Sequence, residues 1–251
     1  MRSVRTLRTA RAAIGAALVA LGTWLGDGCD DGPEVISAVA RGRQLFADPR
    51  LSNSAFNAYA CATCHASTDP AGAAPPIAVS LFGVVDRASW WGGKITTLYD
   101  AVDFCWVYFM RGHPALASGS DDARALFEYL ASLGDGTPRT TAPLTVVETI
   151  APIARGDATR GAATFARSCA GCHGAPHTGR GRISEDAAIV PDDSDEFAAA
   201  NGFDPELVVI EKVRHGSFFG ISGTMPLFTR EALSDEALGD LLAFLDPHLP
   251  P

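Results

Sequence analysis

Two short segments of the chain place two cysteines and a histidine at the same spacing. Residues 61–65 are Cys-Ala-Thr-Cys-His, and residues 169–173 are Cys-Ala-Gly-Cys-His. The residues concerned are Cys61, Cys64, His65, Cys169, Cys172 and His173. In this motif the thiols add to the vinyl groups of haem as thioethers, and the adjacent histidine becomes the proximal iron ligand. A structural zinc site would need four converging ligands, for which no further cysteine pair exists, so we expect two covalently bound haem c groups.

Two cysteines stay outside these motifs, Cys29 and Cys105. A disulfide between them is chemically permitted in an oxidising compartment. However, Cys29 lies in a leader-like segment and Cys105 in an apolar stretch with helical character, so the geometry of a disulfide is hard to reach. Each cysteine therefore needs its own explanation.

The N-terminus has the features of an export signal. Four arginines precede residue 12, residues 12–25 are apolar, and small residues follow; the apolar stretch is short for a membrane span. We expect residues 1–28 to be a signal peptide and the protein to be periplasmic. Cys29 follows a small residue, as the lipid-accepting cysteine of bacterial lipoproteins does, although Gly26 and Asp27 depart from that pattern. A membrane tether through lipidated Cys29 and simple cleavage nearby stay open as alternatives.

The chain is acidic. Its formal charge is -9, and residues 1–28 hold four arginines and one aspartate, so a chain that starts at Cys29 carries about -12. Haem propionates would add further negative charge. This balance argues against nucleic-acid binding and favours redox partner proteins with basic docking surfaces.

Each haem motif lies within one copy of an internal sequence repeat. Each half begins with Gly-x-x-x-Phe, at residues 42–46 and 161–165, continues to a haem motif, and ends in a segment with helical spacing of apolar residues, at 123–133 and 236–245. The first closing segment follows Ser120 and stops at Gly134, and the second follows Ser234 and stops at Pro247. Helices are therefore expected at both places.

Each half resembles a class I cytochrome c domain. The resemblance implies an all-α fold in which the first and last helices of each domain cross near the haem. The glycine of Gly-x-x-x-Phe would let the backbones approach, and the phenylalanine would meet Tyr129 or Phe244 of the closing helix. Residues 134–143 have the composition of a linker. We expect domain 1 at residues 33–138, a linker at 139–156, and domain 2 at 157–251.

The distal ligand of the second haem follows from the same resemblance. Residues 223–228, Gly-Thr-Met-Pro-Leu-Phe, resemble the loop by which cytochromes c present an axial methionine, and they follow a helix-like segment at residues 205–215. Met225 is therefore the expected sixth ligand. His177 and His215 are the alternatives, but His177 lies only four residues after His173 and would need a large chain reversal.

The first half departs from this pattern, because no methionine follows Gly112 where Met225 follows Gly216. Residues 100–114 resemble the cysteine-bearing helix of thiosulfate dehydrogenases and related sulfur-oxidising cytochromes, and Cys105, Met110 and Gly112 match the places of that family's Cys, Met and Gly. Cys105 and Met110 are both candidates for the sixth ligand, with His113 or no ligand as alternatives, and a plain core cysteine is a further alternative for Cys105. Since they are five apart on a helix, only one should reach the iron without local unwinding.

Two functions follow as hypotheses. The first is a dihaem cytochrome that transfers single electrons in the periplasm or at the cell envelope. The alternative is a dehydrogenase that oxidises thiosulfate or a related sulfur anion at the first haem, with Cys105 catalytic and with Arg87, Lys94 and Arg111 as the nearest cations for the anion.

Two further features bear on the first haem. Residues 42–52 also resemble a segment of dihaem peroxidases, but that resemblance stops soon afterwards. The tryptophans at 90 and 91 are expected to form part of the haem wall.

Overall fold

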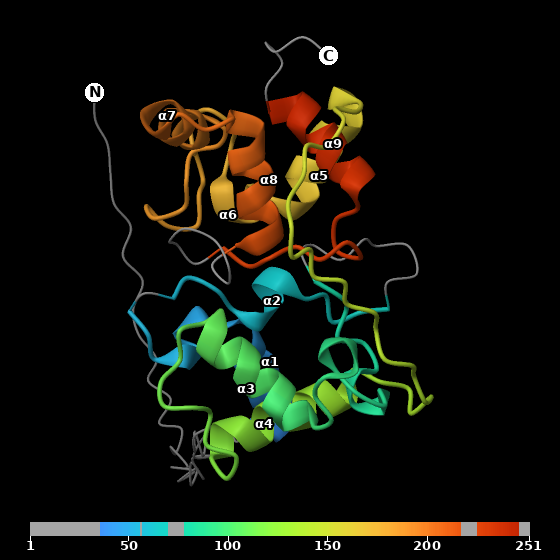
Figure 1. Cartoon of the computed structure of the whole chain (residues 1–251). Coiled ribbons are helices and arrows are strands. Elements are labelled where there is room, and N and C mark those ends of the chain that lie inside the picture. The colour runs from blue at the N-terminus through green and yellow to red at the C-terminus, as the bar shows by residue number, and fades with distance from the viewer. Residues whose placement is uncertain (1–35, 56, 70–77, 217–224, 246–251) are drawn as a thin grey trace, which may run out of the picture. The chain divides into compact units, whose positions relative to one another are not determined.

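The computed structural model describes residues 36–55, 57–69, 78–216 and 225–245, all within one compact unit, Ile36–Pro251. The signal peptide expected at 1–28 and Cys29 lie outside the described residues. The described part is helical, with two isolated β-bridges and no strand (Figure 1). This confirms the all-α prediction. No helix in the described ranges is long and apolar enough to cross a membrane.

The described residues of the first half form four α-helices and three short 3-10 helices. They are α1 (Ala38–Ala47), η1 (Pro49–Ser52), α2 (Cys61–Cys64), η2 (Val84–Asp86), η3 (Trp91–Gly93), α3 (Leu98–Tyr108) and α4 (Asp121–Ser132). Helices α1 and α4 each have a serine as N-cap residue. The Ser37 hydroxyl accepts a hydrogen bond from the backbone N–H of Ala40, and the Ser120 hydroxyl accepts one from that of Ala123.

Five α-helices lie in the described part of the second half. They are α5 (Ala158–Ser168), α6 (Ala170–His173), α7 (Asp192–Asn201), α8 (Pro205–His215) and α9 (Asp235–Leu245). The helix expected at 205–215 is present, with Pro205 in the first turn and the Asp204 carboxylate capping the N–H groups of Glu206 and Leu207.

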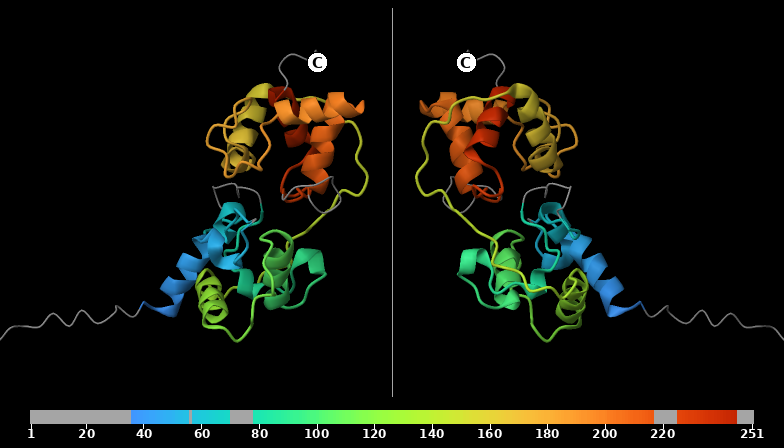
Figure 2. Two further views of the ribbon diagram at one scale, coloured as in Figure 1. Left: turned by 90° about the vertical axis from the view of Figure 1, so that its left-hand side faces the viewer. Right: turned by 90° about the vertical axis from the view of Figure 1, so that its right-hand side faces the viewer.

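Each half has its own pair of crossed helices, α1 with α4 and α5 with α9, which can be followed from two further sides in Figure 2. A Cβ added at Gly42 would lie 2.0 Å from the carbonyl oxygen of Ala125, and one added at Gly161 would lie 2.0 Å from that of Asp240. The helices thus meet backbone to backbone, as the repeat predicted.

The aromatic contacts expected beside these glycines are also confirmed. The ring centroids of Phe46 and Tyr129 are 5.3 Å apart, and those of Phe165 and Phe244 are 5.6 Å apart. Phe46 and Phe165 each belong to the buried core of their own half. The residues that repeat in the sequence therefore make the same packing contacts in both halves.

The segment expected as a linker, residues 139–156, is bonded to its surroundings at several points. The backbone N–H of Arg139 donates to the carbonyl of Asp86 at 2.9 Å, and that of Gly156 donates to the carbonyl of Gly239 at 3.0 Å. Between them, Glu231 accepts from both the backbone N–H and the hydroxyl of Thr145. The segment is therefore part of the packed structure at both of its ends, and the domain boundaries proposed around it stay a prediction.

Replacement of Gly42 by alanine tests the crossing of α1 and α4. The added methyl group would collide with the backbone of Ala125 and with the Cβ of Tyr129. We expect the free energy of unfolding to fall by about 1–3 kcal/mol, measured by denaturant titration of the haem-loaded protein. Gly119→Ala is the matched control, because nothing lies within 4 Å of a Cβ there; equal effects at both positions would contradict the close crossing.

Candidate functional site

The first haem motif forms one helical turn followed by an extended residue. The N–H of His65 donates to the carbonyl of Cys61 at 2.9 Å, which closes the turn over the two thiols. The imidazole Nδ1 of His65 lies 2.8 Å from the carbonyl oxygen of Val79. A carbonyl oxygen can only accept, so Nδ1 carries the proton and Nε2 keeps its lone pair, the arrangement that metal-ligating histidines adopt.

The second haem motif repeats this arrangement. Cys169 stands at the N-terminus of α6, and the N–H of His173 donates to its carbonyl at 2.9 Å. The Nδ1 of His173 lies 2.8 Å from the carbonyl oxygen of Ala188. Sequence reasoning identified both histidines but missed both acceptors, because a backbone carbonyl leaves no mark on the sequence.

An apolar cavity of about 490 Å³ lies over the first haem motif. Cys61, Cys64 and His65 all line it, and so do Trp90 and Trp91, which places the tryptophans where a haem wall was expected. The volume is within the range of roughly 300–1,000 Å³ that is typical of pockets for organic ligands. The thiols, the free Nε2 and the apolar wall together fit a covalently attached haem.

Burial shapes the chemistry of this cavity. Although the cysteines keep part of their residue surface accessible, burial of the thiols raises the pKa of Cys61 to about 11 and that of Cys64 to about 12. Burial also raises the pKa of Cys105 and lowers the pKa of His65. The cavity therefore favours neutral groups, and a thiolate at Cys105 would need a cation beside it.

Cys105 and Met110 both line this cavity, which brings the two sulfur candidates together. Helix α3 ends at Tyr108, and the N–H groups of Phe109 and Met110 both donate to the carbonyl of Cys105, at 3.0 and 3.1 Å. This widened last turn is the local unwinding that the helical spacing required before both residues could face one cavity. His113 is exposed and lies outside the lining.

Two of the three cations proposed to hold an anion also line the cavity. Arg87 and Lys94 belong to the lining and Arg111 does not. Arg87 donates to the backbone carbonyl of Ser80, and its pKa is lowered by burial and by the nearby charge of Arg139. Glu148 contributes a carboxylate to the same lining, so the cavity has charges of both signs.

In the second half, Met225 packs against the same buried core as Cys169. A Cβ on Gly216, at the end of α8, would lie 2.5 Å from the carbonyl oxygen of Met225, so the two backbones are in close contact. The alternative ligands are engaged elsewhere. The Nδ1 of His177 lies 2.7 Å from a carboxylate oxygen of Asp192, and the Nε2 of His215 lies 3.0 Å from the carbonyl oxygen of Val147.

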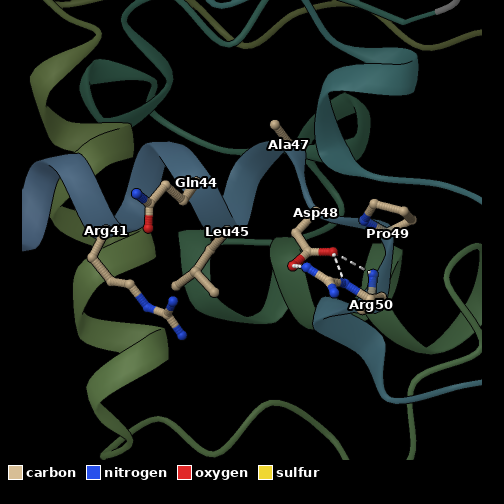
Figure 3. Close-up of a pocket in the computed structure, with 7 residues that line it drawn as sticks. All are labelled: Arg41, Gln44, Leu45, Ala47, Asp48, Pro49 and Arg50. Atoms are coloured by element: carbon tan, nitrogen blue, oxygen red, sulfur yellow. Dashed lines mark hydrogen bonds and ion pairs between the residues drawn. The ribbon is translucent and has the colours of Figure 1, made fainter.

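A second hollow of about 590 Å³ lies beside α1 and η1 (Figure 3). The residues that line it include none from either haem motif. Its cations are paired: Arg50 binds Asp48 at 2.9 Å, and Arg41 binds Asp122 at 2.9 Å. The charged side chains of this hollow are thus each held in an ion pair. Within the described ranges, no three His, Cys, Asp or Glu residues gather as a metal-binding cluster.

Comparison with known proteins finds a family match for the second half. Residues 156–245 match the family described as cytochrome c oxidase, cbb3-type, subunit III. No curated protein matches the chain. Among solved structures, the chain is similar to thiosulfate dehydrogenase (TsdBA) from Marichromatium purpuratum, "as isolated" form, with 19% identity and a TM-score of 0.38, over 85% of this chain and 48% of that one. The chain thus spans about half the length of that structure.

The family match covers the haem motif at 169–173, α5 to α9 and Met225. The all-helical structure of the described residues and the two haem-attachment motifs are consistent with the cytochrome c domain that this match indicates for the second half.

Proposed function

We propose that the chain is a dihaem cytochrome that transfers single electrons in the periplasm or at the cell envelope. The observation that carries this proposal is that His65 and His173 have the same hydrogen bond. The Nδ1 atom of each lies 2.8 Å from a backbone carbonyl oxygen. That bond fixes the ring and leaves Nε2 for iron in both halves.

The residues divide into two ligand sets. Cys61 and Cys64 would hold the first haem and His65 would be its proximal ligand; Cys169, Cys172 and His173 would do the same for the second. When bound, each haem supplies an iron that accepts and releases one electron. On the distal sides, Met225 would serve the second haem, and Cys105 or Met110 the first.

The ligand sets would give the haems different potentials. A methionine thioether raises the potential of a haem, whereas a thiolate donates electron density to the iron. With Cys105 on the first haem and Met225 on the second, electrons would pass from the first haem to the second. With Met110 in place of Cys105 the difference would be smaller.

The location and partners belong to the same proposal. Export through residues 1–28, with or without a lipid on Cys29, would place the chain where covalent haem attachment occurs. Its negative charge, about -12 after residue 28, would favour redox partners with basic docking surfaces. Such association should weaken as salt is added.

The haem count is tested by removing one attachment site. We expect two covalently attached haems per chain in the mature wild-type protein and one in the Cys61→Ser, Cys64→Ser double variant, because no thiol is left in the first motif to form a thioether. Iron analysis and the mass of the intact protein measure the count. Cys105→Ser is the control and should keep two haems; a wild-type chain with one haem would contradict the proposal.

The ligand of the second haem is tested at Met225. Replacement of Met225 by histidine should remove the near-infrared band of methionine-ligated ferric haem and lower one of the two midpoint potentials, because imidazole replaces the thioether. His177→Gln and His215→Gln are matched controls, since both side chains have other partners. If either control moves the potential as far as the Met225 variant does, the assignment is wrong.

Oxidation of a sulfur anion is the second candidate function. It is favoured by the presence of Cys105, Arg87 and Lys94 in one cavity, where guanidinium and ammonium groups could bind an oxyanion beside the first haem. The acidic Glu148 in the same lining would oppose anion binding. We therefore place this activity second to electron transfer.

Replacement of Cys105 by serine distinguishes the two candidates. If Cys105 is the ligand, electron paramagnetic resonance of the oxidised wild type shows a thiolate-type low-spin signal that the variant lacks. If the site is also catalytic, the variant loses reduction of its haems by thiosulfate. Met110→Leu is the control and should keep both properties. Unchanged thiosulfate-dependent reduction in Cys105→Ser would sink the enzymatic hypothesis while leaving electron transfer intact.

A further inference from the structure

Arg214 is the most deeply buried charged residue among the described parts of the chain. It lies in the last turn of α8 and is 1% exposed. A buried guanidinium must satisfy its donors with hydrogen-bond acceptors, because removal of a charge from water is costly. Where those donors go therefore indicates what the residue holds.

The Nη1 and Nη2 donors go to the segment that follows Met225, whereas Nε has no hydrogen-bond partner among the described residues. The Nη1 of Arg214 donates to the carbonyl of Leu233 at 2.7 Å and to that of Phe228 at 3.2 Å, and lies 3.5 Å from the carbonyl of Thr229. Its Nη2 donates to a carboxylate oxygen of Asp235 at 2.6 Å. One side chain thus binds the backbone at the beginning and end of the stretch from Phe228 to Leu233, as well as the first residue of α9.

The neighbours of Arg214 in α8 hold the same segment. The carbonyl of Val213 accepts from the N–H of Phe228 at 2.8 Å. Gly216 has φ +56° and leaves no room for a Cβ, which would lie 2.5 Å from the carbonyl of Met225. Residues 213–216 therefore contact the backbone at Met225 and just after it, and Arg214 adds charged hydrogen bonds to the residues that follow.

The first half offers an internal comparison. When Gly112 is placed on Gly216, the position of Arg214 is taken by Met110. Met110 is 6% exposed and lines the first cavity, and this half has no methionine after its glycine. The arginine is thus found in the half that has the methionine loop and is missing from the half that lacks it.

We infer that Arg214 is a positioning residue that keeps the Met225 thioether at the second haem by fixing the backbone of residues 228–235. This rests on the proposed ligation by Met225. Stability alone gives a weaker account, because a buried ion pair is often replaced by apolar residues without loss of stability. A residue that only joined α8 to α9 would affect unfolding but not the bond between iron and sulfur.

The test uses the haem-loaded full chain and measures how readily imidazole displaces the sixth ligand of the second haem. Arg214→Lys keeps the charge but cannot reach several carbonyls with one planar fork, and Arg214→Met removes the charge. We expect imidazole to bind the second haem about tenfold more tightly in Arg214→Lys, equivalent to about 1.4 kcal/mol, and more tightly still in Arg214→Met. The potential of that haem should fall in the same order.

The controls separate this inference from the proposed function. The Met225→Ala variant identifies which spectroscopic signal belongs to the second haem. If imidazole binding is unchanged in this variant, the proposal that Met225 is a haem ligand is wrong. Arg230→Met is the matched arginine control: its Nε lies 3.5 Å from the same Asp235, but its side chain is 55% exposed. It should leave imidazole binding unchanged.

Each remaining outcome decides for or against Arg214. Suppose that Met225→Ala raises the imidazole affinity of the second haem, whereas Arg214→Lys lowers the melting temperature and leaves the imidazole affinity unchanged. Arg214 then has a structural role only. If neither Arg214 variant yields folded protein, Asp235→Asn weakens the same hold at a half-exposed partner and should raise imidazole affinity by a smaller factor. Wild-type affinity in that variant would overturn the inference.

Discussion

The contact that the rest of this structure depends on is the backbone-to-backbone crossing of the first and last helices of each half. At Gly42 and Gly161 a carbonyl oxygen of the closing helix occupies the space of a Cβ, so the helix axes lie closer than ordinary side chains would allow. Helix α5 ends one residue before Cys169, so this crossing also sets where the second haem motif begins. In the first half, η1 and residues 53–60 intervene before Cys61, and the motif reaches its place by a longer route.

The sequence predicted the parts of the fold whose information is local. The spacing of Cys61, Cys64 and His65, the apolar period of the closing helices and the helix at 205–215 each require only neighbouring residues. The carbonyls of Val79 and Ala188 could not be predicted, because they lie 14 and 15 residues from their histidines and every residue has a carbonyl. The same holds for Arg214, whose burial depends on acceptors up to 21 residues away.

The end of α3 shows where a regular pattern misleads. On an ideal helix, residues five apart point in different directions, which set Cys105 against Met110. The structure ends the helix at Tyr108 and turns the N–H of Met110 back to the carbonyl of Cys105. The sequence does carry a signal for this early end, since Gly112 and Pro114 follow closely. It carries no signal for the shared cavity, which depends on the packing of distant segments.

The two halves are alike around the histidine of each haem motif and differ around the sulfur-bearing residues proposed as distal ligands. His65 and His173 make the same bond at the same length, so the proposed proximal side supplies no reason for two different potentials. The first cavity raises the pKa of Cys105 through burial, which makes a thiolate there dependent on a positive iron centre. The second half instead holds a neutral thioether on a backbone fixed by a buried cation. If both motifs carry haem as proposed, a functional difference between the haems would arise on the distal side, where Cys105 and Met110 line the cavity of one half and Met225 packs in the core of the other.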